Sequence, residues 1–158
     1  MLGFTPTAFA LVLAADGVGL LITGAIAARL ATTYSPRRLI AIGLSIAALG
    51  AGVALFAVIF DAVNAWTMIS SMVLIGASMG FVFGSATTLA VSSLTHLAGT
   101  ALAVLGSIQF VFAGVAAPLV GLAGERSAVP YVIVATATIG GAFIALALAR
   151  APHSEKGD

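Results

Sequence analysis

The amino-acid sequence predicts an all-α membrane protein with about five transmembrane helices. Hydrophobic residues make up 61% of the 158 positions and charged residues 7%, and the mean hydropathy is +1.23. Soluble domains are about 45–50% apolar and about 25% charged, so this chain could not cover a water-facing surface. Its few basic residues could not neutralise a run of phosphates either, so we expect the lipid bilayer and no nucleic acid as its partner. A helix needs about 20 residues to cross a bilayer, so a chain of this length holds about five.

Five long apolar runs account for most of the chain. Each is long enough to cross the hydrocarbon layer as a helix, and none shows the strict alternation of a barrel strand. Short polar turns join them, so we expect a single transmembrane helical domain over residues 1–150 and a polar tail over residues 151–158. The expected spans cover residues 7–28, 39–60, 66–91, 99–122 and 130–149.

The basic residues predict which side of the membrane each loop occupies. If the spans alternate, one side receives a single basic residue, Arg126, and the other receives Arg29, Arg37, Arg38, Arg150 and Lys156. Short loops rich in Lys and Arg stay in the cytoplasm, so we expect a cytoplasmic C-terminus and an outside N-terminus. Trp66 and Tyr131 then stand at the outer ends of their spans, as interfacial anchors do. The first span lacks the positive flank of a signal peptide and looks like a helix that a preceding helix delivers.

One charged residue, Asp16, lies inside an expected span, and the other four spans contain no charge. A carboxylate near the bilayer centre costs at least about 2.5–3.5 kcal/mol on insertion scales. Asp16 should therefore face the interior of the bundle, be protonated, or both. Two interpretations remain open: a coupling or substrate-contact site for a proton or cation, and a neutral acid that forms a hydrogen bond with a neighbouring helix.

Glycines recur on one face of the third and fourth spans. They are spaced by four residues on the third span and by seven or eight on the fourth, and both spacings keep them on one helical face. Small residues let neighbouring helices approach closely, so tight helix packing is the main interpretation and a cavity-facing surface is the alternative. The glycines are Gly76, Gly80 and Gly84 on the third span and Gly99, Gly106, Gly114 and Gly121 on the fourth.

Hydroxyl groups are common on the third span, whereas the second span has only Ser45. This contrast predicts that the third span borders a polar cavity, with Ser78 and Ser85 among its lining residues, and that the second span faces lipid. Hydroxyls can also bond back to their own helix, which is the alternative. On the fourth span, Gln109 and Phe110 could contact a ligand, or the amide could make one hydrogen bond between helices.

One stretch matches a catalytic pattern. Residues 76–80 read Gly-Ala-Ser-Met-Gly, which fits the G-x-S-x-G pattern of serine hydrolases. That pattern needs a strand–turn–helix context, and here it lies within an apolar helix. The two histidines, His96 and His153, stand at the expected membrane edges. The chain has no cysteine, no metal-ligand cluster and no phosphate-binding loop, so we expect no enzyme activity, no cofactor and no metal.

The fourth span resembles a known family. Residues 98–106 (AGTALAVLG), Gln109-Phe110 and residues 117–121 (APLVG) resemble the eleventh helix of the Bcr/CflA drug-resistance transporters, drug:proton antiporters of the major facilitator superfamily. Weaker similarity over residues 9–38 resembles the eighth helix and its basic loop. Gly84-Ser85 replaces a common Pro-Asn pair, and Asp16 replaces a common Asn. Because an acid stands at position 16 in place of the amide, the role of this position in the family cannot be assigned to Asp16.

The resemblance implies that the five spans correspond to helices eight to twelve of a twelve-helix fold, an incomplete C-terminal half. It implies a part of a secondary transporter that exports drugs or other small amphipathic substrates by proton antiport from the bacterial inner membrane. The missing N-terminal half or another chain would then be a partner, and we expect no transport by this chain alone. The alternative is a small helical membrane protein that acts by association with a partner chain through its glycine faces.

Overall fold

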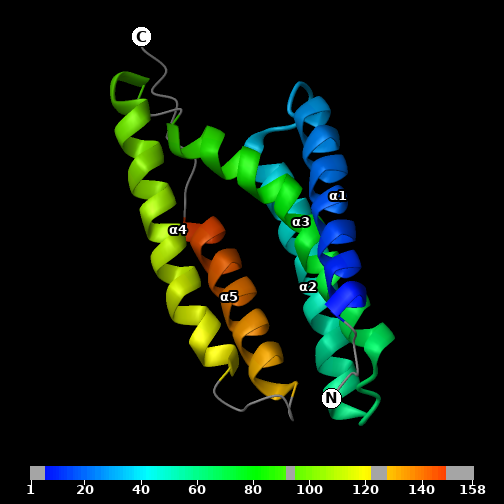
Figure 1. Cartoon of the computed structure of the whole chain (residues 1–158). Helices are drawn as coiled ribbons and strands as arrows, with labels where there is room; N and C mark the ends of the chain where they lie inside the picture. The colour runs from blue at the N-terminus through cyan, green and yellow to red at the C-terminus, as the bar shows by residue number, and fades with distance from the viewer. Residues whose placement is uncertain (1–5, 92–94, 122–127, 149–158) are drawn as a thin grey trace.

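The computed structural model describes residues 6–91, 95–121 and 128–148 and shows five long helices (Figure 1). All five are long and apolar enough to cross a membrane, and no strand occurs within the described residues. The predicted fold class, an all-α chain with five candidate membrane spans, is therefore confirmed. The elements are α1 (Pro6–Leu30), α2 (Pro36–Ile59), α3 (Ala65–Val91), the short 3₁₀ helix η1 (Thr95–Leu97), α4 (Ala98–Gly121) and α5 (Val129–Leu148).

The second helix begins earlier than its apolar run. Pro36 stands at the start of α2, where the missing proline N–H does no harm because the first N–H groups of a helix have no partner within it. The first turn of α2 therefore includes Arg37 and Arg38, which the sequence predicts to lie before the span. An Nη atom of Arg37 donates a hydrogen bond to the carbonyl oxygen of Leu146, 2.8 Å away near the end of α5. The start of α2 and the end of α5 are thereby tied together.

Part of the charge pattern falls on described residues. Arg29 is in the last turn of α1, so it lies at the end of the bundle where α1 leads into α2. The other basic residues that predict the orientation, Arg126, Arg150 and Lys156, lie outside the described residues, as do His153 and the polar tail. The orientation of the chain in the membrane stays a prediction.

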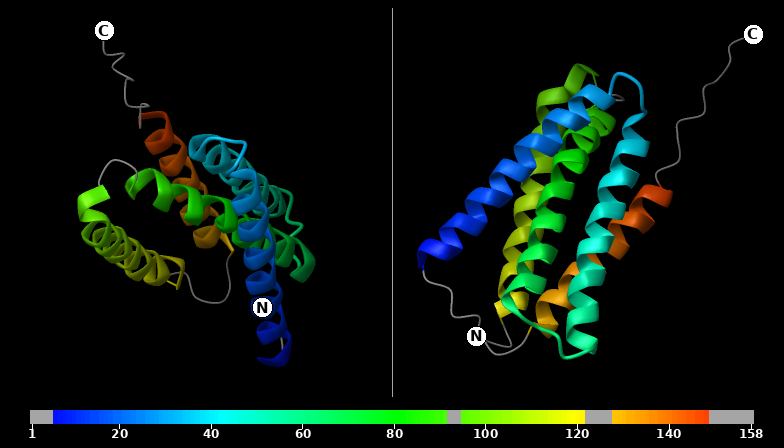
Figure 2. Two further views of the ribbon diagram at one scale, coloured as in Figure 1. Left: turned by 90° about the horizontal axis from the view of Figure 1, so that it is seen from above. Right: turned by 90° about the vertical axis from the view of Figure 1, so that its right-hand side faces the viewer.

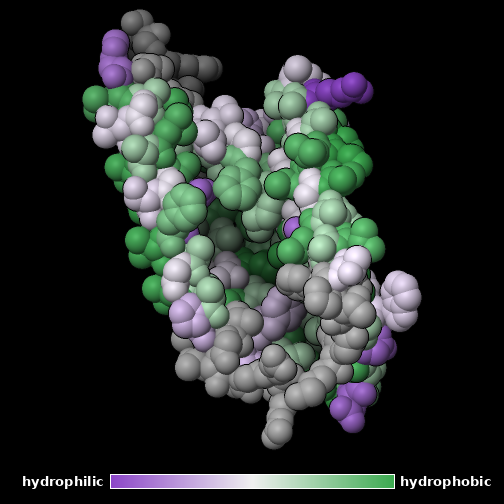
Figure 3. Space-filling model, viewed as in Figure 1, coloured by the Kyte–Doolittle hydropathy of each residue, from purple (hydrophilic) through white to green (hydrophobic). Residues whose placement is uncertain are grey.

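Helices α1, α2 and α3 form the packed part of the molecule. α3 packs against both α1 and α2 (Figures 1 and 2), and α5 lies beside α2, where Val132 joins Ala54 and Ala57 of α2 and Met68 of α3 in one buried cluster. α4 lies alongside α5, further from the other helices, and has no buried residue among those whose exposure is described (Figure 1). The surface is hollowed between α4 and α1 (Figure 3).

The backbones of α2 and α3 approach closely at two glycines. A Cβ atom added at Gly43 would lie 2.8 Å from Cγ2 of Val82 and 3.0 Å from the carbonyl oxygen of Ser78. A Cβ atom at Gly50 would lie 2.9 Å from a side-chain carbon of Ile75 and 3.0 Å from the Ser71 carbonyl oxygen. Glycine at both positions lets the two helices pack nearly backbone to backbone.

The prediction that the second span faces lipid is wrong for one face of α2. Its buried face packs mainly through small and aliphatic residues, while Leu49, Phe56 and Ile59 remain exposed. The helix is apolar on both faces, and low polarity alone cannot distinguish a lipid-facing surface from a protein-facing one, because both exclude water. The buried residues are Leu39, Ile40, Gly43, Leu44, Ala47, Gly50, Ala51, Ala54 and Ala57.

Candidate functional site

The side chain of Asp16 points from α1 at Gly76 of α3. A Cβ atom at Gly76 would overlap the Asp16 carboxyl group, so only glycine leaves the space that this carboxyl occupies. One turn further along α3, a Cβ atom at Gly80 would overlap the Thr23 hydroxyl and lie 2.5 Å from the backbone nitrogen of Gly24. The two glycines thus form the contact of α3 with α1, and the structure places Asp16 inside the bundle at that contact.

One oxygen of the Asp16 carboxyl group has no hydrogen-bond partner in the described part of the chain. Oδ1 is buried and accepts no hydrogen bond from any residue that the structure describes. The carboxyl lies at the edge of a cavity of about 220 Å³ between α1, α3 and α5. Most of the wall formed by described residues is apolar, including Val12, Met72 and Ile75, and the polar side chains among them are Asp16 and Tyr131. We call this space the Asp16 cavity.

Tyr131 brings a hydroxyl group of α5 to the wall of the Asp16 cavity. Its oxygen lies 3.2 Å from the hydroxyl oxygen of Ser71 on α3, and Ser71 is fully buried. The sequence interpretation treats Tyr131 as an interfacial anchor and does not single out Ser71. A usable signal exists in the spacing: Ser71, Ser78 and Ser85 recur every seven residues, which keeps them on one face of α3. All three serines are buried.

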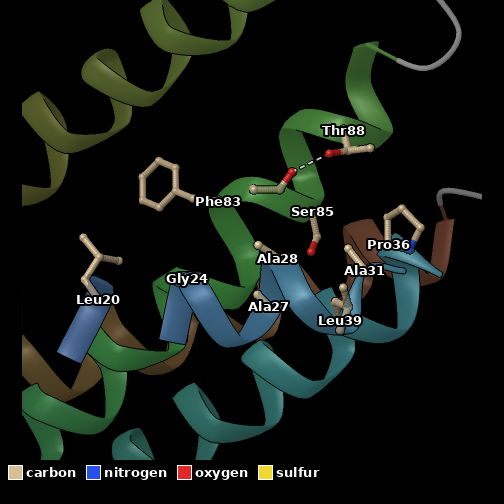
Figure 4. Close-up of a pocket in the computed structure, with 12 residues that line it drawn as sticks. Leu20, Gly24, Ala27, Ala28, Ala31, Pro36, Leu39, Phe83, Ser85 and Thr88 are labelled. Atoms are coloured by element: carbon tan, nitrogen blue, oxygen red, sulfur yellow. Dashed lines mark hydrogen bonds between the residues drawn. The ribbon is translucent and has the colours of Figure 1, made fainter. Parts of the chain in front are cut away.

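Ser85 lines a second, larger cavity of about 600 Å³. This cavity lies between α1, the start of α2 and α3, and its wall is mostly small or apolar (Figure 4). Ser85 is 7% exposed, and Thr88 adds a second hydroxyl that donates to the carbonyl oxygen of Gly84, 2.8 Å away. On the other side lie Ala27 and Ala28 of α1 (Figure 4). We call this space the Ser85 cavity.

Three of the other candidate residues lie elsewhere. Ser78 is fully buried, and its hydroxyl donates to the carbonyl oxygen of Ile75 at 2.6 Å, so the structure places it in the packed contact of α3 with α2 and in neither of these two cavities. The reason is that Gly43 brings α2 directly against this turn of α3. Gln109 and Phe110 are exposed on α4, Phe110 at 82%, and line neither cavity.

The glycines predicted to pack helices divide into two groups. Gly76 and Gly80 lie in the contact of α3 with α1, as described above. A Cβ atom at any of the others with described surroundings would meet open space, because α4 packs loosely and Gly84 borders the Ser85 cavity. These open positions are Gly84, Gly99, Gly106 and Gly114. Gly121 ends α4, and its surroundings lie outside the described part of the chain.

Comparisons with known proteins identify no relative of this chain. No protein-family model, no curated protein and no solved structure matches the chain. The resemblance to the Bcr/CflA transporters therefore rests on the residues of the sequence itself, and the two cavities are the features from which a function can be inferred.

Proposed function

We propose that this chain is part of a secondary active transporter that exports drugs or other small molecules by proton antiport, with Asp16 as the coupling residue. The observation that carries the proposal is a buried carboxyl oxygen that has no hydrogen-bond partner among the described residues, inside a candidate membrane span and at the edge of a cavity. Inserting an ionisable residue into a membrane span costs free energy, and such residues mark ion pathways and proton relays.

The position of Asp16 links its protonation to helix packing. A neutral carboxyl can stay buried against Gly76, whereas an ionised one needs hydrogen-bond donors or water to offset its desolvation. Loss of the proton would therefore favour a change in how α1 lies on α3. The Ser85 cavity is walled by the same two helices, so a change at Asp16 would also alter that cavity.

The Ser85 cavity is the candidate substrate site. Its volume of about 600 Å³ falls within the about 300–1,000 Å³ typical of small-molecule sites. A mostly apolar wall with the hydroxyls of Ser85 and Thr88 suits a small amphipathic molecule. In a complete transporter, alternating access would come from one half rocking against the other, with the missing half or another chain as the partner. The site would then lie in the bacterial inner membrane, with the C-terminus in the cytoplasm.

Flux measurements in proteoliposomes test this proposal. We purify the chain together with its native partner and reconstitute both. We then expect a fluorescent amphipathic compound to move in the direction opposite to the imposed proton flow, and to change direction when the proton gradient is reversed. We expect the chain reconstituted alone to give no gradient-driven flux. If the flux through the assembly does not depend on the proton gradient, proton antiport is excluded. If the monomeric chain alone gives gradient-driven flux, the need for a partner is excluded.

A second candidate function is association with a partner chain through α4. The observation that favours it is the open face of this helix: no described residue of α4 is buried, and Gly99, Gly106 and Gly114 have open space beside them. We expect crosslinking in native membranes to capture one partner in fixed stoichiometry, and Gly106→Leu to lower the yield at least about tenfold, because a bulky side chain blocks close helix approach. The matched control is Gly52→Leu on α2, which also faces open space. Equal yields for both variants would rule out the α4 face.

A further inference from the structure

We propose that Tyr131 is the hydrogen-bond partner of Asp16 in its ionised state, and that its hydroxyl moves from Ser71 to Asp16 when Asp16 releases its proton to water in the Asp16 cavity. This inference rests on the proposed proton exchange at Asp16 and adds the residue that responds to it. It assigns to Tyr131 a positioning role that joins α5 to the α1–α3 contact.

The Asp16 cavity has room for the water that the exchange requires. Its volume is about 220 Å³, and one water molecule takes about 30 Å³ of liquid, so the space admits several waters. Buried water also needs polar partners, which the carboxyl group of Asp16 and the hydroxyl group of Tyr131 supply from the same wall. The cavity is therefore both large enough and polar enough to be hydrated.

The hydrogen bonds among the described residues leave one carboxyl oxygen of Asp16 without a donor. Tyr131 is bonded to Ser71 at 3.2 Å, and Asp16 Oδ1 has no partner among the described residues. An ionised carboxylate only accepts hydrogen bonds, so it requires a donor. Among the described residues that line the cavity, Tyr131 is the one with a side-chain donor besides the carboxyl itself, and Asp16 and Tyr131 are the titratable ones. Besides the cavity water, Tyr131 is therefore the described side chain that can donate to an ionised Asp16.

The step is balanced without any further reactant. The O–H bond of the Asp16 carboxyl breaks, the electron pair stays on the carboxylate, and the proton leaves on a cavity water as hydronium. Tyr131 keeps its own proton, breaks its hydrogen bond with Ser71 and donates to the carboxylate. Ser71 can then donate to a carbonyl of its own helix, as Ser78 does to Ile75. A hydrogen bond between α5 and α3 is thereby exchanged for one between α5 and α1.

Infrared difference spectroscopy of the full chain in lipid bilayers, with isotope-labelled tyrosine, tests the inference. In the alkaline-minus-acid spectrum we expect loss of the Asp16 carboxyl band together with a shift of one tyrosine C–O band. Tyr131→Phe should remove the tyrosine shift and keep the loss of the carboxyl band. Tyr34→Phe is the matched control and should keep both signals, because Tyr34 is the other of the two tyrosines and lies exposed between α1 and α2. Asp16→Asn should remove both.

A second pair of variants tests the role of Ser71. Ser71→Ala removes the competing partner, so we expect the tyrosine band shift to fall to less than half. Ser78→Ala should keep the full shift, because Ser78 is equally buried on the same face of α3 but bonds to its own helix. Loss of the carboxyl band without a Tyr131 shift would overturn this inference and leave proton exchange at Asp16 intact. A carboxyl band that does not change with pH would overturn both.

Discussion

Replacing Gly80 with alanine is expected to lower the free energy of unfolding by about 3 kcal/mol, the upper end of the usual cost of overpacking. The added Cβ would overlap the Thr23 hydroxyl and lie 2.5 Å from the nitrogen of Gly24 and 2.8 Å from the carbonyl carbon of Thr23. Backbone atoms cannot rotate away as a side chain can, so α1 itself would have to move off α3. The measurement is unfolding by a denaturing detergent, followed by the loss of helical circular dichroism.

Gly84 provides the matched control for this prediction. It lies one turn further along the same face of α3, and a Cβ there would meet nothing within 4 Å. Because alanine favours the helix over glycine by about 1 kcal/mol in water, we expect Gly84→Ala to leave stability unchanged or slightly raised. An equal loss in both variants would show that the cost has nothing to do with the contact between α1 and α3.

If the chain acts in the proposed antiporter, Asp16→Asn in the reconstituted assembly is expected to reduce proton-driven flux at least about a hundredfold, which is about 2.7 kcal/mol at about 1.36 kcal/mol per factor of ten. The amide keeps the size of the carboxyl group and fits beside Gly76, but it cannot release a proton. Binding of the compound at the proposed site in the Ser85 cavity should persist. The measurements are flux under an imposed proton gradient and equilibrium binding of the same compound.

Asp61→Asn is the control for loss of one acidic charge. Asp61 lies between α2 and α3, outside the candidate spans, and has a φ angle of 50°. Asparagine tolerates this left-handed conformation as well as aspartate does, so the backbone should be unaffected and the flux unchanged. If the Asp16 variant keeps its gradient-driven flux, Asp16 is not the coupling residue.

The five helices could be predicted because each apolar run exceeds the length needed to cross a bilayer. The rotation of each helix about its own axis could not be predicted from the sequence. In α2 the apolar residues continue around the helix, so the sequence does not mark Gly43 and Gly50 as the face toward α3. In soluble helices a polar stripe reveals the outward face, whereas lipid and protein neighbours both accept apolar residues. The sequence also predicts too late a start for α2, because Pro36 fits the first turn of a helix as well as the turn before it.

The candidate site could be predicted in part. The cost of an intramembrane carboxylate singles out Asp16, and the spacing of Gly76 and Gly80 indicates a helix contact. The contact between Tyr131 and Ser71 could not be predicted, because the two residues are 60 positions apart in sequence and their contact depends on how α5 lies relative to α3. No periodic pattern within one helix contains that information.

The space beside Gly76 makes positions 16 and 76 depend on each other. A side chain at position 76 and the carboxyl group at position 16 would occupy the same volume, so position 76 can gain a side chain only if the carboxyl group moves or is replaced. In any lineage of related chains we therefore expect substitutions at these two positions to be correlated, with a larger residue at 76 accompanied by a smaller one at 16. A chain that gained alanine at position 76 would have to turn the Asp16 carboxyl group out of its present place or replace it, so the glycine at 76 fixes where the acid of this bundle lies.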